Sequence, residues 1–197
     1  LTRLEELFPG RLHVDRYQWT PETLPEPARH GPAMAATLHL GQACVPMLER
    51  LSGGSILDVR FYATFALTEL DATSVLEAVR ERLFDRDAQT RAMAQRVLLA
   101  HRYTPTFEAQ VLAPLREMLA DAPDESHVEH AAELLGRVRD RESMEVLIEQ
   151  LDLHRSHIKE AIHLALQRIT LQPLPEASIA WQTWLQSSQE ETRQEWL

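Results

Sequence analysis

The sequence lacks several features that would assign it to a membrane or an oxidising compartment. It has one cysteine among 197 residues, which excludes an internal disulfide, and the apolar neighbours of Cys44 favour a small buried side chain over a reactive thiolate. It has no run of about 18 apolar residues and no basic segment followed by an apolar core, which argues against a transmembrane helix and a signal peptide. We therefore expect a cytoplasmic protein.

Positive charge is scarce as well. Lys and Arg number 20 and Asp and Glu number 30, which gives a formal net charge of −10. Because phosphate neutralisation supplies most of the non-specific affinity for DNA, this charge argues against a nucleic-acid partner, and it also disfavours an anionic membrane. With 6 glycines and a hydrophobic fraction of 44%, the chain is neither collagen-like nor wholly disordered. A protein partner with a basic surface fits this charge.

Motifs for catalysis and metal binding are missing too. The sequence contains no glycine-rich phosphate loop, no nucleophile elbow and no His-Glu-x-x-His pattern. Two histidine pairs, His127 with His130 and His154 with His157, have i,i+3 spacing but no third ligand at a suitable distance. His127 and His157 each come directly before a repeated helical segment, which favours a turn or capping role. We expect no enzyme, no cofactor and no metal site.

A repeated helical pattern is present instead. Four segments open with a residue pair and continue with small or apolar residues at helical spacing. The pair is apolar then polar in three of the segments, and both of its residues are polar in the second. The opening pairs are Val59-Arg60, Thr90-Arg91, Val128-Glu129 and Ile158-Lys159. After each of the first three, a polar break precedes a second apolar stripe, so each unit is predicted to be a helical hairpin. The starts are separated by roughly 30, 38 and 30 residues, and the insert Tyr103-Thr104-Pro105-Thr106 accounts for the longer interval.

The repeat openings resemble those of a known family. Asp58-Val59-Arg60-x-x-Ala63, Ala88-x-x-Arg91-x-x-Ala94 and Ile158-Lys159-x-x-Ile162 are similar to bacterial HEAT repeats of the short, phycobilisome-lyase-like kind. The resemblance covers Gly31 to about Leu185. It implies an all-α fold, a right-handed α-solenoid of about five HEAT-like helical hairpins. Glu129 stands where the third copy would carry a basic residue, so the charge ladder between repeats is not expected to be regular.

The two ends of the chain differ from the repeats. Residues 1–30 are rich in proline, carry Tyr17 and Trp19, and predict an extended N-terminal cap over the first hairpin. Residues 31–170 predict the HEAT-like array, and residues 171–197 predict a C-terminal capping helix and tail. Trp181 and Trp184 share one helical face and are expected to seal the last repeat. We expect all three parts to form one structural domain.

The second helix of each hairpin is expected to line the inner wall of the array, where a partner binds. The polar candidates on that wall are Glu77, Arg80, Glu81, Glu117, Glu145 and Glu149. Most of the acidic surplus lies between Arg116 and Asp152, which hold four arginines against eleven carboxylates. Glu145 and Glu149 are one helical turn apart, where like charges cost stability unless a basic surface arrives. The alternative is a solvated face that only aids solubility.

Two further features have both a structural and a binding interpretation. Phe61 and Phe65 lie off the apolar stripe of their helix, so they are either covered by the preceding hairpin and the N-terminal segment or form an exposed protein-binding spot. Nineteen of the basic residues are arginines. They either contact a partner or form ion pairs within the array, such as Asp85 or Asp87 with Arg91.

These observations predict a non-enzymatic scaffold or adaptor module of a larger bacterial protein, which binds a protein partner on its curved, acidic surface. The resemblance leaves open a HEAT-repeat enzyme or its regulatory subunit, similar to a bilin lyase. The charge equally fits an immunity or inhibitor protein that acts against a basic toxin. The oligomeric state stays open.

Overall fold

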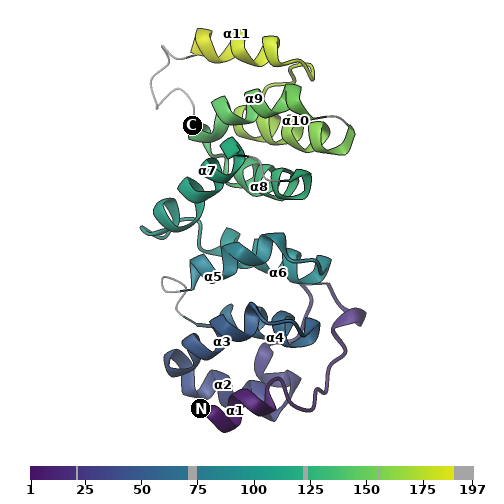
Figure 1. Cartoon of the computed structure of the whole chain (residues 1–197), viewed down its shortest axis with the longest axis vertical. Coiled ribbons are helices and arrows are strands. Elements are labelled where there is room, and N and C mark those ends of the chain that lie inside the picture. Colours follow the sequence, from purple (N-terminus) through teal and green to yellow (C-terminus); the bar gives the residue numbers. More distant parts are fainter. Residues whose placement is uncertain (21, 71–74, 122–123, 155, 189–197) are drawn as a thin grey trace. The chain divides into compact units, whose positions relative to one another are not determined.

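The computed structural model describes residues 1–20, 22–70, 75–121, 124–154 and 156–188 (Figure 1). Within these ranges every regular element is helical and no strand occurs, which confirms the all-α class. None of the helices found there combines the length and the apolar content needed to cross a bilayer. The chain divides into two compact units, Leu1–Val111 and Leu112–Leu197, and their boundary falls inside the segment predicted to be the repeat array.

The first unit is built around a buried helix. Its α-helices are α1 (Thr2–Leu7), α2 (Pro32–Leu40), α3 (Val45–Ser52), α4 (Leu57–Leu67), α5 (Leu76–Glu81) and α6 (Ala88–Ala100), with short 3-10 turns η1 (Arg16–Gln18), η2 (Pro27–His30), η3 (Gly41–Cys44) and η5 (Arg82–Phe84). Every residue of α4 from Phe61 to Leu67 is buried. Helix α6 begins at a polar cap, because the Asp87 carboxylate accepts a hydrogen bond from the Thr90 amide.

The N-terminal segment, residues 8–20 and 22–31, packs on this helix largely without regular structure, as its prolines predict. Phe8, Leu24 and His30 are buried. The His30 ring lies edge-on to Tyr62 and Phe65 of α4, and its Nε2 donates a hydrogen bond to the Pro25 carbonyl. This segment therefore contributes to the core of the first unit.

The second unit contains longer helices. They are α7 (Ala113–Asp121), α8 (Glu125–Val138), α9 (Met144–Leu153), α10 (Ser156–Thr170) and α11 (Ser178–Ser188), with a 3-10 turn η7 (Arg141–Ser143); a π-helical turn, η6 (Glu108–Leu112), comes before α7. Helices α8 and α10 lie side by side in close contact (Figure 1). A Cβ atom on Gly136 would stand 2.7 Å from the Ala165 Cα, so glycine is what permits this approach.

The contacts inside each unit repeat along the chain. In the first unit α2 contacts α4, and α4 contacts α6; in the second unit α8 contacts α10, α7 contacts α9, and α9 contacts α11. Each predicted repeat opening lies in the first turns of α4, α6, α8 or α10. Trp181 of α11 is fully buried beside the His163 ring of α10, whereas Trp184 is only half-buried.

Candidate functional site

Phe61 and Phe65 do not form a binding surface. Their side chains are 0% and 3% exposed. Phe61 packs edge-on against Tyr62, and Phe65 packs against His30 from the N-terminal segment. The prediction of an exposed aromatic spot is therefore wrong. The covered alternative is correct: His30 and Arg16 of the N-terminal segment lie against these rings, whereas Tyr17 and Trp19 of the same segment are exposed.

The candidates on α5 form a cluster that is largely satisfied within the first unit. Arg80 Nη2 lies 2.8 Å from Glu81 Oε1 and 4.0 Å from Glu77 Oε1, while its Nη1 donates a 2.8 Å hydrogen bond to the Gln110 carbonyl. Both glutamates are exposed, and the single Arg80 guanidinium offsets one of their two charges. This cluster therefore offers a partner one uncompensated negative charge.

The remaining candidates, Glu117 on α7 and Glu145 and Glu149 on α9, are exposed carboxylates. None of them forms an ion pair with another residue in the part of the chain that the structure describes. Neighbouring carboxylates do: Glu142 lies 2.8 Å from Arg116 Nη1. The strongest candidates from the sequence are thus among the exposed, unpaired carboxylates of the second unit.

Glu145 and Glu149 also line a groove between two helices. With Ile148 of the same helix and Gln182 and Leu185 of α11, they surround a cavity of about 150 Å³. Ile148 is buried and forms an apolar floor, while the two carboxylates stand exposed at the rim. We call these five residues the acidic groove. An apolar floor below two carboxylates fits the aliphatic stem and charged head of one lysine or arginine side chain.

The charge of the surrounding unit has the same sign. Residues 112–197 hold eight Lys and Arg against sixteen Asp and Glu, a net of −8, whereas residues 1–111 hold twelve against fourteen, a net of −2. Most of the acidic surplus of the chain is therefore in the unit that carries the acidic groove.

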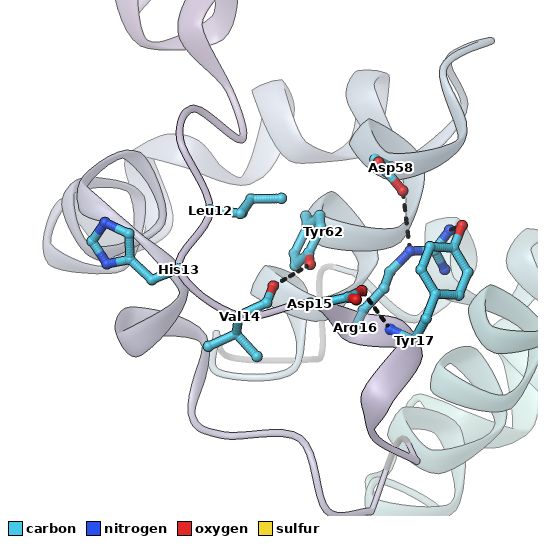
Figure 2. Close-up of a pocket in the computed structure, with 8 residues that line it drawn as sticks. All are labelled: Leu12, His13, Val14, Asp15, Arg16, Tyr17, Asp58 and Tyr62. Atoms are coloured by element: carbon cyan, nitrogen blue, oxygen red, sulfur yellow. Dashed lines mark hydrogen bonds and ion pairs between the residues drawn. The ribbon is translucent and has the colours of Figure 1, made fainter.

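Sequence reasoning missed a buried arginine in the first unit. Arg16 is 1% exposed, and its Nε donates to Asp58 Oδ1 at 3.1 Å (Figure 2). Its Nη1 donates to Asp87 Oδ2 and to Gln89 Oε1, both at 2.8 Å, and its Nη2 donates to the Tyr17 hydroxyl at 2.7 Å. Burial opposes the charge, but the hydrogen bond and the charge of Asp87 outweigh it, so the pKa of Arg16 lies above its usual value.

One signal for this arginine was available in the repeat pattern. Asp58 and Gln89 occupy the same position, directly before the opening pair of the first and second repeats, and both accept hydrogen bonds from Arg16. In the third and fourth copies that position holds His127 and His157. Nothing in the local pattern of residues 1–30 singles out Arg16 as the donor.

The predicted role of His127 needs a correction. It lies inside the first turn of α8, not before it, because the helix begins earlier, at Glu125. The cap is Asp124, whose carboxylate accepts from the His127 amide at 2.9 Å and lies 2.6 Å from His127 Nδ1. The hydrogen bond from the His127 side chain holds the pKa of Asp124 well below its usual value. In the described ranges, no three His, Cys, Asp or Glu side chains are grouped to hold a metal ion.

The predicted ion pairs of Arg91 are also wrong. Asp85 bonds instead to Arg60 Nε of α4, at 2.8 Å, and Asp87 bonds to Arg16. Arg91 Nη1 donates to the main-chain carbonyl of Asp85. The pair between Arg60 of α4 and Asp85 of the loop before α6 has a counterpart in the second unit, where Arg116 of α7 bonds to the carboxylate of Asp140 in the loop after α8.

Comparison of the chain with protein-family models, with curated proteins and with solved structures finds no match. A functional assignment therefore rests on the geometry and charge of the two units.

Proposed function

We propose that this protein is an interaction module that binds a basic segment of a protein partner at the acidic groove between α9 and α11. The observation that carries the proposal is the pair Glu145 and Glu149, which are exposed, unpaired within the described residues, and set on the rim of a groove with an apolar floor. A lysine or arginine from the partner would place its stem on Ile148 and its charge between the two carboxylates.

Electrostatics supports this choice of partner. Two like charges one helical turn apart cost a few tenths of a kcal/mol in the free protein. A cation that binds between them makes their electrostatic contribution favourable. The net charge of −8 on residues 112–197 also attracts a basic partner from a distance. Screening limits this attraction to about 8 Å at physiological ionic strength, so binding should weaken with added salt.

The HEAT-like array is part of the same proposal. The contacts of α4 with α2 and α6, of α8 with α10, and of α9 with α7 and α11 support stacked hairpins, and we propose a right-handed solenoid of about five of them. The single, buried cysteine supports a reducing, cytoplasmic setting. An inhibitor of a basic toxin would use the same groove, and it differs from a scaffold only in abolishing the activity of its partner.

Charge reversal tests the proposal. The intact chain, the variant E145K/E149K and the matched control E160K/E176K would each be used to capture proteins from a bacterial lysate for mass spectrometry. Glu160 and Glu176 are exposed carboxylates outside the groove, so the control makes the same change in net charge. We expect a basic protein captured by the wild type and the control and lost with E145K/E149K. Capture that is equal for all three chains would overturn the assignment.

A further inference from the structure

A second cavity lies in the first unit, between the N-terminal segment and α4. Its volume is about 330 Å³, within the range of about 300 to 1,000 Å³ typical of small-ligand sites. Leu12, Val14, Asp15 and Arg16 line it from the segment, and Asp58 and Tyr62 line it from α4 (Figure 2). All of them belong to one compact unit, and none is part of the acidic groove.

The walls of this cavity are fixed to each other. The Tyr62 hydroxyl of α4 donates a 3.2 Å hydrogen bond to the Val14 carbonyl of the segment, and Arg16 bonds to Asp58. Burial raises the pKa of Tyr62 to about 12, so its hydroxyl keeps the proton that this bond needs. A preformed cavity spares a ligand the cost of ordering the protein.

The hydrogen-bonding groups around the cavity favour a ligand that donates hydrogen bonds. Four of the five N–H groups of Arg16 are already used by Asp58, Asp87, Gln89 and Tyr17, so the guanidinium has little left for an anion. By contrast, Asp58 uses only Oδ1 for Arg16, and its side chain is 53% exposed.

The second carboxylate, Asp15, accepts from the Tyr17 amide at 3.1 Å and from Gln18 Nε2 at 3.4 Å, and it retains unused lone pairs. His13 and Tyr17 also line the cavity, and the Tyr17 hydroxyl accepts from Arg16. Figure 2 shows the His13 ring directed away from Tyr62 and Asp58. Acceptors therefore outnumber donors around the cavity.

The charge and the apolar lining of the cavity further restrict the chemical class of the ligand. Arg16 is balanced by Asp87 outside the cavity, which leaves the charges of Asp15 and Asp58 in excess. Leu12, Val14 and the Tyr62 ring supply an apolar wall. We infer that this cavity binds an organic cation with an aliphatic stem, such as a lysine or arginine side chain or a free alkylamine.

Model compounds test this inference on the full chain labelled with ¹⁵N. The probes are the N-acetyl methylamides of lysine and arginine, the neutral norleucine analogue, and free butylamine and butylguanidine. We expect saturable amide shifts at residues 12–17 and at Asp58 with the cationic probes and no such shifts with norleucine. Tighter binding of the amino-acid amides than of the free amines would assign the ligand to a protein side chain, and the reverse order to a small amine.

Variants test the role of the carboxylates. Asp58→Asn keeps the oxygen that Arg16 uses but removes the charge, and it should weaken the cationic probes by about tenfold or more. Asp15→Asn is a second variant in case the first unfolds. Glu69→Gln is the matched control, because Glu69 is an exposed carboxylate of the same unit outside the cavity. Equal shifts with norleucine, no saturable shifts, or affinities unchanged in both aspartate variants would overturn the inference.

Discussion

In the first unit Asp85 and Asp87 are bonded to Arg60 and Arg16, whereas in the second unit Glu145 and Glu149 face solvent with no cation partner among the described residues. Arg60 and Arg16 hold the pKa values of Asp85 and Asp87 below the usual one, although burial alone would raise them. Asp85 and Asp87 thus stabilise the first unit, while Glu145 and Glu149 of the second unit are available to a partner.

The two units also differ in how their backbones are held together. The first unit keeps an irregular segment in place with a buried, fully surrounded arginine, whose guanidinium lies 4.5 Å from the centre of the Phe61 ring. The second unit relies on close helix packing, with Gly136 of α8 against Ala165 of α10. A substitution in the Arg16 cluster should therefore destabilise only the first unit, and a substitution at Gly136 only the second.

The largest effect is expected from Arg16→Ala. The substitution leaves Asp87 with a largely buried, unpaired charge, which costs about 3–5 kcal/mol of folding free energy. Chemical denaturation should show this loss, and hydrogen exchange should locate the new exposure in residues 1–111. Arg11→Ala, at an exposed arginine of the same segment, is the control and should change stability by less than about 0.5 kcal/mol. Equal stability of the two variants would show that the Arg16 cluster does not hold the first unit together.

A smaller effect is expected from Gly136→Ala in the second unit. The added Cβ meets the Ala165 backbone at 2.7 Å, so α8 and α10 must separate. Overpacking of this kind costs about 1–3 kcal/mol, and the better helix propensity of alanine returns about 1 kcal/mol. We expect a net loss of up to about 2 kcal/mol. Hydrogen exchange should become faster in α8 and α10 and stay unchanged in α4. A more stable variant would contradict the close packing of these two helices.

The local part of this architecture could be predicted from the sequence. The openings at Val59, Thr90, Val128 and Ile158 lie at the starts of helices because periodicity reports contacts within one helix. The same spacing correctly put Glu145 and Glu149 on one exposed face. Arg16 could not be predicted in this way, since it joins residues 42 and 71 positions away, and neither could the contribution of α11 to the acidic groove.

His30 should make the stability of the first unit depend on pH. Its burial lowers its pKa in the folded protein, although the hydrogen bond to Pro25 opposes this effect. The unfolded chain therefore binds the proton more readily, and stability should fall as the pH drops below about 6.5. Thermal unfolding of His30→Phe should lose this dependence, and the exposed His39→Gln should keep it. An unchanged pH profile in His30→Phe would exclude His30 as its source.

The smallest effect has the opposite sign and bears most directly on the comparison of the two units. Replacing both Glu145 and Glu149 by Gln removes a like-charge repulsion across one helical turn, so the second unit should gain about 0.2–0.5 kcal/mol. Asp87→Asn in the first unit should instead lose about 1–2 kcal/mol, because Asp87 accepts hydrogen bonds from both Arg16 and Thr90. Chemical denaturation at low ionic strength measures whether each variant is more or less stable than the wild type. A gain in the second unit means that Glu145 and Glu149 cost folding free energy in the free protein, as the proposed binding role predicts. A loss there would mean that Glu145 and Glu149 stabilise the fold, and the difference between the two units would disappear.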